Sequence, residues 1–224
     1  MTAPARPQRI GMFGGTFDPV HLGHLRSGVE LCESLELDQL HMMPAPQPPL
    51  RDRPQVSAEQ RLALLKAGIG DTPRLVADDR ELRREGPSYS LLTLEALRSD
   101  YGIEARLIMA LGQDAFLKLA DWHQPERLFE LAHIVVMARP GYSPKRSQAL
   151  LELLAGREVN SVGELMAAPH GGVLPVTLPS PMGISATGIR RRLAKGGSVR
   201  YLLPEAVERE IEHQCLYRLP ESGR

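Results

Sequence analysis

Short apolar runs alternate along the chain with stretches whose apolar residues recur at helical spacing. The runs are typical of buried strands, and we expect strands at residues 10–13, 40–43, 75–77, 106–111, 133–138 and 173–178. The helical spacing predicts helices at residues 21–37, 57–67, 90–99, 147–155, 185–194 and 204–213, with shorter helical pieces between 111 and 133. Ser57 and Gln60 have the spacing of a capping box and predict where the second helix begins.

The alternation of strands and helices predicts an α/β protein, in which helices cover both faces of a parallel sheet. We expect a single domain over residues 1–224, with residues 1–9, which are polar and rich in proline, as a flexible N-terminal tail. Ligands of such sheets bind beyond the carboxyl ends of the strands. The segments that follow strands are therefore the places to look for chemistry.

Charge and cysteine content narrow the classes of function. Lys plus Arg (27) equals Asp plus Glu (27), and a neutral chain is a poor candidate for binding nucleic acid or anionic membranes. The apolar runs are too short to span a bilayer, the N-terminus lacks the apolar core of a signal peptide, and two cysteines define no disulfide framework. We therefore expect a soluble cytoplasmic protein without nucleic-acid or membrane partners, and the sequence carries no signal for its oligomeric state.

The most informative segment joins the first expected strand to the first expected helix and reads Gly-Gly-Thr-Phe-Asp-Pro-Val-His-Leu-Gly-His. Gly14 and Gly15 let the backbone approach a ligand closely, and Thr16 adds a hydroxyl. His21 and His24 project from one side of the first helical turn, beside the free N–H groups and partial positive charge of a helix N-terminus. Protonation of either ring would strengthen its attraction to polyphosphate. The segment predicts a phosphate site; the alternatives are a tight turn with incidental histidines, or a zinc site that lacks an evident third ligand.

A second candidate phosphate site follows the last expected strand and reads Ile-Ser-Ala-Thr-Gly-Ile-Arg from Ile184 to Arg190. Ser185 and Thr187 are good helix-capping residues, and Arg190 can turn its guanidinium back toward the same anion. The alternative is an ordinary capped helix with a basic, solvated face. Two phosphate-type segments after the first and last strands of one sheet are more informative together than either is alone.

The first segment resembles the signature of the nucleotidyltransferases with an H-x-G-H motif, in the form found in bacterial nicotinate mononucleotide adenylyltransferases. The second segment resembles the I-S-x-T-x-I-R motif of the same family, and the likeness extends from Ile10 to Arg218. It implies a Rossmann-like nucleotidyltransferase fold in which the helical segment 185–224 closes the ATP site. It also implies an enzyme of NAD biosynthesis that transfers AMP from ATP to nicotinate mononucleotide and releases pyrophosphate.

The resemblance assigns roles to individual residues on the ATP side. It implies three catalytic residues, His21, His24 and Arg190. Magnesium is the implied cofactor, held mainly by the ATP phosphates and water, so no protein ligand of a metal is assigned. The residues implied to bind ATP are Gly14, Gly15, Thr16, Phe17, His24, Gly112, Asp114, Ile184, Ser185, Thr187 and Arg190.

A further set of residues is implied to bind the mononucleotide. Trp122, the only tryptophan, resembles the family's tryptophan that stacks on the pyridine ring, and a flat indole suits that ring. The alternatives are a packing anchor for Trp122, a solvated turn residue for Arg139 and an ordinary helix N-cap for Asp114. The complete mononucleotide set is Arg51, Tyr89, Ser90, Trp122, His123 and Arg139.

The loop after the second expected strand departs from the family pattern. Leu50 stands where the family has His, and Ala45 and Pro46 stand where it has Asn, whereas Arg51 is kept. The preference for the acid or the amide mononucleotide therefore stays open. The rival functions are a pantetheine-phosphate adenylyltransferase or a cytidylyltransferase and, from a different class, a non-catalytic nucleotide-binding module.

Overall fold

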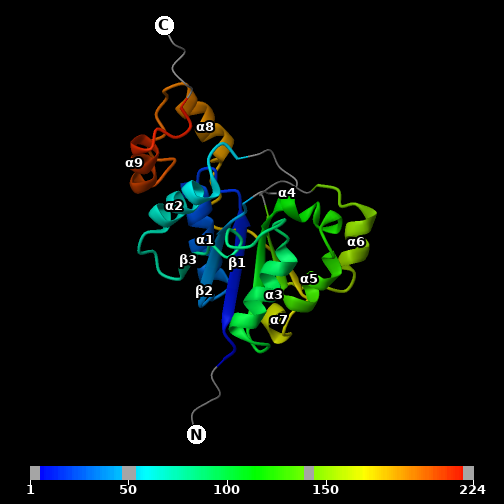
Figure 1. The fold of residues 1–224 in the computed structure, drawn as a ribbon. Helices are drawn as coiled ribbons and strands as arrows, with labels where there is room; N and C mark the ends of the chain where they lie inside the picture. Colours follow the sequence, from blue (N-terminus) through cyan, green and yellow to red (C-terminus); the bar gives the residue numbers. More distant parts are fainter. Residues whose placement is uncertain (1–5, 47–53, 139–143, 219–224) are drawn as a thin grey trace. The chain divides into compact units, whose positions relative to one another are not determined.

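The computed structural model describes residues 6–46, 54–138 and 144–218 (Figure 1). Contacts group the chain into two compact units that interleave in sequence. The first unit comprises the described parts of residues 1–14, 30–41 and 89–179, and the second those of 15–29, 42–88 and 180–224. The single domain over residues 1–224 stays a prediction, and each unit is described by itself.

The predicted α/β fold with a parallel sheet is confirmed. Six strands form one sheet in the order β3–β2–β1–β4–β5–β6, and β1 pairs in parallel with β4, β4 with β5 and β5 with β6. Five consecutive residues of β4, from Leu107 to Leu111, are buried, which requires cover on both faces of the sheet. The strands are β1 (Arg9–Gly15), β2 (Gln39–Pro44), β3 (Leu75–Ala77), β4 (Arg106–Gly112), β5 (His133–Met137) and β6 (Val173–Val176).

All the predicted helices form, with ends shifted by a few residues. The capping box at the start of α2 has both of its reciprocal hydrogen bonds, between Ser57 and Gln60. Helix α3 packs against α5 and β4 in the first unit, and α2 packs against α9 in the second. The helices are α1 (Leu22–Ser34), α2 (Ala58–Ile69), α3 (Ser90–Tyr101), α4 (Gln113–Phe116), the 3-10 turn η1 (Leu119–Asp121), α5 (Pro125–Leu131), α6 (Gln148–Leu154), α7 (Val162–Ala167), α8 (Ala186–Ala194) and α9 (Glu205–His213).

Helix α1 ends three residues before the predicted position, in a Schellman motif. The backbone N–H of Leu37 donates to the carbonyl of Cys32, and that of Glu36 donates to Glu33. Glu36 has a φ of 50°, a left-handed conformation that usually belongs to glycine at this position. The sequence has no glycine at this position, so the usual signal for the end of a helix is missing.

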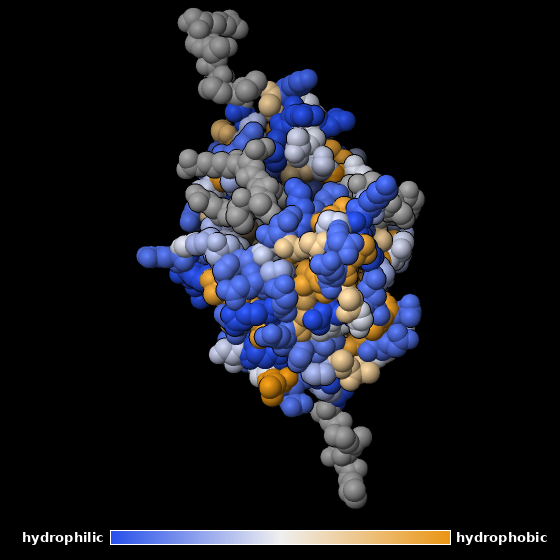
Figure 2. Space-filling view, turned by 90° about the vertical axis from the view of Figure 1, so that its right-hand side faces the viewer, coloured by the Kyte–Doolittle hydropathy of each residue, from blue (hydrophilic) through white to orange (hydrophobic). Residues whose placement is uncertain are grey.

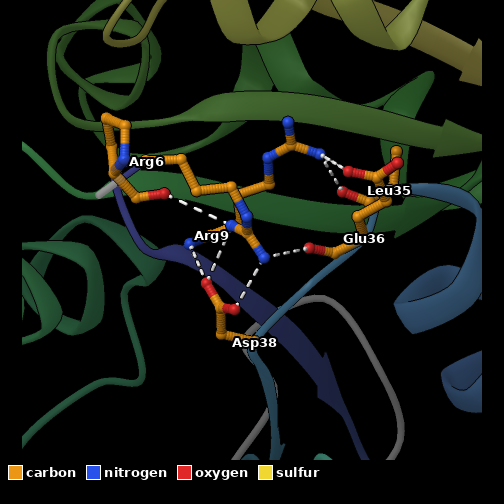
Figure 3. A network of polar contacts seen from close by, with 6 residues as sticks. Arg6, Arg9, Leu35, Glu36 and Asp38 are labelled. Atoms are coloured by element: carbon orange, nitrogen blue, oxygen red, sulfur yellow. Dashed lines mark hydrogen bonds and ion pairs between the residues drawn. The ribbon is translucent and has the colours of Figure 1, made fainter. Parts of the chain in front are cut away.

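Residues 6–9, which we expected in a flexible tail, are held by a network of charged groups (Figure 3). The Arg6 guanidinium binds both carboxylate oxygens of Asp38 at 2.8 and 3.1 Å. The Arg9 backbone N–H donates to Asp38 as well, and its side chain binds the Glu36 carboxylate and the Leu35 carbonyl. The start of β1 is thereby tied to the turn between α1 and β2. Residues 1–5 lie outside the described part of the chain.

The surface mixes polar and apolar side chains. On the face drawn in Figure 2, hydrophilic residues alternate with smaller hydrophobic patches. Among the described residues, no helix is long and apolar enough to cross a membrane. The large apolar side chains that are exposed come from separate parts of the sequence: Leu92, Ile103, Leu151, Met182 and Tyr201.

His133, the first residue of β5, is fully buried and hydrogen-bonded through both ring nitrogens. Its Nδ1 accepts from the Gly172 backbone N–H, and its Nε2 donates to the Ala168 carbonyl, each at 3.1 Å. Only the neutral ring with its proton on Nε2 makes both bonds. Burial is the main cause that lowers the pKa of His133 from 6.5 to about 4. Its ring therefore stays neutral while it ties β5 to the segment before β6.

We expect His133 to make the folded state sensitive to acid. The folded state keeps the ring neutral down to about pH 4, whereas the unfolded chain binds a proton below about pH 6.5, so stability is lost as pH falls through this window. At pH 5 the loss from this residue is about 2 kcal/mol. Urea denaturation at pH 7 and pH 5 measures it. His133→Gln keeps a donor and an acceptor without titrating and should lose less stability by about this amount.

The matched control for this experiment is His213→Gln, which changes an exposed histidine at the end of α9. Its loss of stability between pH 7 and pH 5 should equal that of the unmodified chain. If His133→Gln and the unmodified chain lost the same free energy of unfolding, the role given to His133 would be wrong.

Candidate functional site

The turn between β1 and α1 carries the first predicted phosphate segment. A Cβ on Gly15 would come within 3.0 Å of the Phe17 ring, which is itself only 1% exposed. Gly14 is exposed, and a Cβ there would come no closer than 4.0 Å to any atom, that of Met12 Cε. Packing therefore explains the glycine at position 15 but not the one at position 14. The backbone at Gly14 is open to the approach of a ligand.

The two histidines of the turn lie face to face. Their ring centroids are 3.6 Å apart and their planes differ by 19°. Nδ1 of His21 accepts from the backbone N–H of His24 at 3.3 Å, and the Phe17 ring meets the His24 ring edge-on at 5.0 Å. A Cβ on Gly23 would come within 3.1 Å of His21 Nδ1, so this glycine leaves room for the stack. Gly23 and the backbone N–H of His24 thus hold the two histidine rings in their stacked orientation.

His21 is neutral in this arrangement. Burial lowers the pKa of His21 from 6.5 to about 4, and the ring is 5% exposed. Because Nδ1 accepts a hydrogen bond, the proton of the neutral ring lies on Nε2. The sequence left open a protonated His21 that attracts phosphate by charge. The structure instead gives a neutral hydrogen-bond donor.

The N-terminus of α1 offers fewer free N–H groups than we expected. The Leu22 N–H donates to the Leu202 carbonyl at 3.0 Å, and the N–H groups of His24 and Leu25 donate to the His21 carbonyl. These donors already have partners within the protein. An anion here would depend more on side chains and on the preceding turn than on the amides of α1.

The second predicted phosphate segment opens helix α8. Ser185 is its N-cap, and the Ser185 hydroxyl accepts from the Gly188 N–H at 3.2 Å. Thr187 does not cap the helix; its hydroxyl accepts from Nη2 of Arg190 at 3.4 Å. Ile184 lies against the first segment, because its Cβ is 3.7 Å from the place a Cβ on Gly23 would take.

Arg190 joins the two segments directly. Its Nη1 donates to the backbone carbonyl of Asp18 at 2.7 Å and lies 3.7 Å from the Asp18 carboxylate oxygen Oδ2. The Arg190 side chain is 23% exposed, and its Nε is buried without a hydrogen-bond partner among the described residues. The two phosphate-type motifs therefore meet through Asp18 and Arg190, which both belong to the second unit and lie 172 residues apart in sequence.

Asp18 is the centre of these contacts, and sequence analysis assigned it no role. The carboxylate is 3% exposed. The Tyr217 hydroxyl donates to Oδ1 at 2.8 Å, and the Gln55 N–H donates to Oδ2 at 3.1 Å. Burial, reinforced by the nearby Asp18 carboxylate, raises the pKa of Tyr217 far above its ordinary value, so the phenol stays a donor. The only sequence signal was that Asp18 and Tyr217 both lie in strings that resemble the family.

Arg61, on helix α2, is a second buried residue that sequence analysis missed. It is fully buried, and Nη1 donates to the carbonyls of Thr16 at 2.6 Å and Ala45 at 2.8 Å, while Nη2 donates to Pro46 at 3.1 Å. Burial lowers the pKa of Arg61, and the charge of Asp18 opposes that shift. The guanidinium thus fixes the segments that follow β1 and β2. Its position inside a helical pattern gave no signal of this.

The first unit contains most of the residues predicted to bind the mononucleotide. The rings of Tyr89 and His123 stack, with centroids 4.3 Å apart and planes 19° from parallel. Ser90 begins α3, and Trp122, which is half-buried, follows the turn η1. These positions are separated by more than 30 residues in sequence, yet the stack brings Tyr89 and His123 together. Arg51 and Arg139, the other two members of the set, lie outside the described residues.

The segment after β4 contains Gly112 and Asp114, the two residues predicted to lie against the adenosine of ATP. The N-cap of α4 is Gly112, and Asp114 is the second residue of that helix, so the alternative of Asp114 as the N-cap is wrong. Asp114 is exposed. No atom of the described residues lies within 4 Å of the position that a Cβ on Gly112 would take. Packing does not require a glycine there, which leaves its backbone open.

Comparison with known families identifies the class of protein. The sequence profile described as cytidylyltransferase-like matches residues 12–192, which include both phosphate-type segments. The chain therefore belongs to the cytidylyltransferase-like family of nucleotidyltransferases.

Its relatives identify the branch of that family. A Chromohalobacter salexigens protein named "Probable nicotinate-nucleotide adenylyltransferase" is 61% identical over 96% of this chain and 98% of its own. A Pseudomonas syringae pv. tomato protein of the same name is 45% identical over 96% of both chains. The chain is a member of the nicotinate-nucleotide adenylyltransferases of NAD biosynthesis.

A solved structure supports the fold. Nicotinic acid mononucleotide adenylyltransferase of Plasmodium falciparum, in a complex with NaAD, has a TM-score of 0.67 to this chain at 14% identity. The match covers 94% of this chain and 97% of the other. At this identity the likeness shows a shared architecture alone.

We expect Arg61→Met to lower the free energy of unfolding by about 3 kcal/mol. The substitution keeps most of the length of the side chain but leaves the carbonyls of Thr16, Ala45 and Pro46 without their donors. Arg83→Met is the control, because Arg83 is 76% exposed in a surface ion pair and should contribute no more than about 0.5 kcal/mol. Urea denaturation measures both losses, and equal losses would contradict the role of Arg61.

Proposed function

We propose that this chain transfers the AMP moiety of ATP to nicotinate mononucleotide, forming nicotinate adenine dinucleotide and releasing pyrophosphate. One observation carries the proposal: Arg190 of the second motif binds the backbone of Asp18 within the first motif. The names of the relatives agree with it, as does the NaAD bound by the Plasmodium falciparum enzyme. The reaction belongs to NAD biosynthesis, and we place it in the cytoplasm.

The reaction requires the two substrates to be positioned, and it does not require the protein to activate a nucleophile. The phosphate of the mononucleotide is already anionic at neutral pH and attacks the α-phosphorus of ATP in line, while the bond to the leaving pyrophosphate breaks. The protein has to align the two phosphates and stabilise the charge that develops on the α-phosphate and the leaving group. Hydrogen-bond donors held in place before the reaction do this without reorganisation.

Both motifs supply such donors, and all of them except Gly14 belong to the second unit. We assign the α-phosphate to His24 and to the backbone from Gly14 to Thr16, with His21 assisting as a neutral donor. We assign the outer phosphates of ATP to Ser185, Thr187 and Arg190. The buried Nε of Arg190, which has no partner among the described residues, supports this assignment, because a buried donor is costly unless an acceptor reaches it. Phe17 and Ile184 complete the ATP set by shaping the turn.

Residues of the first unit are proposed to recognise the organic parts of the substrates. Gly112 and Asp114 are assigned to the adenosine of ATP, and the open space over Gly112 supports a close backbone approach. Tyr89, Ser90, Trp122 and His123 are assigned to the mononucleotide, and the stacked rings of Tyr89 and His123 provide flat surfaces of the kind a pyridine ring prefers. Arg51 and Arg139 remain members of this set as predictions.

Nucleotidyltransferases of this family generally use a divalent metal, and we propose that it is Mg²⁺. Among the described residues, no group of three or more His, Cys, Asp or Glu side chains is placed to hold a metal ion. Asp18, the acidic residue of the first motif, already accepts hydrogen bonds from Tyr217 and Gln55. This donor set suits an ion held mainly by the phosphates of ATP and by water, which is how Mg²⁺ usually binds nucleotides.

The direct test supplies the protein with ATP, Mg²⁺ and one acceptor at a time, and measures the pyrophosphate released. We expect turnover with nicotinate mononucleotide, and comparison with nicotinamide mononucleotide gives the preference between acid and amide. Turnover with pantetheine phosphate instead would select another member of the superfamily. No turnover with either pyridine mononucleotide would refute the proposed function.

His24→Ala should lower turnover about 100-fold or more and leave the fold intact, because it removes one preorganised donor at the α-phosphate. Steady-state kinetics measures turnover, and circular dichroism checks the fold. His213→Ala, which changes an exposed histidine on α9, is the matched control and should keep full activity. Turnover of His24→Ala within a factor of about two of the unmodified chain would remove His24 from the mechanism.

A further inference from the structure

Tyr217 occupies a demanding position close to the end of the described chain. Its side chain is 7% exposed, and its backbone φ is 61°, a left-handed conformation that is unfavourable for a tyrosine. Such strain persists only where the surrounding contacts compensate for it. The Tyr217 hydroxyl donates a hydrogen bond to Asp18 Oδ1 at 2.8 Å.

Asp18 contacts both Tyr217 and Arg190. The Asp18 carboxylate holds Tyr217 on one oxygen and the Gln55 N–H on the other. Its backbone carbonyl accepts from Arg190 Nη1, while its carboxylate remains 3.7 Å from the same guanidinium nitrogen. Arg190 is thus bound by the carbonyl of Asp18 rather than by a tight pair with the carboxylate, and its Nη2 is left to reach Thr187.

We propose that Tyr217 is a positioning residue for the adenylyl transfer. By donating to Asp18 Oδ1, it fixes the carboxylate whose other oxygen, Oδ2, lies 3.7 Å from Arg190, and so keeps the Arg190 guanidinium in the orientation that meets the outer phosphates of ATP. This inference rests on the proposed function. A buried carboxylate that loses one donor recruits another, and Arg190 is the nearest cation. Without the Tyr217 hydroxyl, the guanidinium moves toward Asp18 and away from Thr187 and the phosphates.

The first experiment compares Tyr217→Phe with Tyr201→Phe. Both substitutions remove only a hydroxyl, and both residues have left-handed backbone, with φ of 61° and 62°. Tyr201, however, is 85% exposed. We expect Tyr217→Phe to lower kcat/KM for ATP about tenfold and to leave KM for nicotinate mononucleotide within about twofold of the unmodified value. Tyr201→Phe should change neither, and equal effects of the two substitutions would overturn the proposal.

The second experiment shows whether Tyr217 acts through Arg190. A residue that only supports the fold lowers activity by the same factor in any background, whereas a residue that positions Arg190 has nothing to position once Arg190 is replaced. Tyr217→Phe should therefore cause no further loss of kcat/KM for ATP in the Arg190→Ala protein. A tenfold loss in both backgrounds would contradict the inference.

Asp18→Asn provides an independent background. The neutral amide no longer attracts Arg190, so adding Tyr217→Phe to Asp18→Asn should change kcat/KM for ATP by less than about twofold. Thermal unfolding of every variant separates folding from function, and the comparison within the Asp18→Asn background decides the question if Tyr217→Phe alone folds poorly. An undiminished tenfold loss in that background would overturn the proposal.

A wrong function and a wrong role for Tyr217 give different experimental results. If the unmodified chain released no pyrophosphate with either pyridine mononucleotide, the proposed function would be wrong, and the role of Tyr217 in adenylyl transfer would be wrong with it. If the unmodified chain were active and Tyr217→Phe behaved like Tyr201→Phe, only the role of Tyr217 would be wrong.

Discussion

The arrangement of the two phosphate-type motifs depends on the Asp18 carboxylate, which is removed from water. Burying the charge of Asp18 is costly unless hydrogen bonds replace those to water. The hydroxyl of Tyr217 and the N–H of Gln55 do so, and they come from segments far from Asp18 in sequence. Removing either would leave the carboxylate short of a donor, so the loop before α2, the segment after α9 that carries Tyr217 and the turn after β1 are held to one arrangement. The penalty of an unpaired charge, more than the strength of any one bond, makes the arrangement specific.

Arg61 performs the complementary task with the opposite charge. It is buried in the same unit, and its two Nη groups donate to the backbone carbonyls that follow β1 and β2, at Thr16 and Ala45 among others, rather than to a carboxylate. Carbonyl oxygens have fixed positions, so a planar guanidinium that binds several of them defines the path of both segments. The hydrogen bond from the Ala45 N–H to the Gly15 carbonyl holds the same two segments together. A buried anion and a buried cation, each hydrogen-bonded mainly to other partners, thus shape the turn that presents His21 and His24.

The sequence predicted most of the fold because local patterns specify it. Alternating apolar runs and helical spacing located every strand, and a capping box located the start of α2. The errors fall where local signals were missing or weak. Helix α1 ends at Ser34, two residues before Glu36, which adopts a conformation usual for glycine. Helix α7 was not predicted although Ser161 and Glu164 have capping-box spacing, since Gly163 inside it lowers helix propensity. The candidate site also combines features that local sequence encodes with features that it does not. Its motifs are local strings and were visible, whereas the partners of Asp18 are set by contacts across the fold that no spacing rule encodes.

The electrostatics of the phosphate motifs differ from what two histidines beside a helix N-terminus suggest. Burial keeps His21 neutral, and several amides at the start of α1 are already bonded within the protein. The proposed function assigns the attraction of phosphate chiefly to the charge of Arg190, and the Asp18 carboxylate, 3.7 Å away, offsets part of that charge. In the proposed function, one partly buried guanidinium attracts the polyanion at short range in a poorly screened place, although the chain has no net charge. The orientation of that guanidinium depends on its contacts with Asp18 and Thr187.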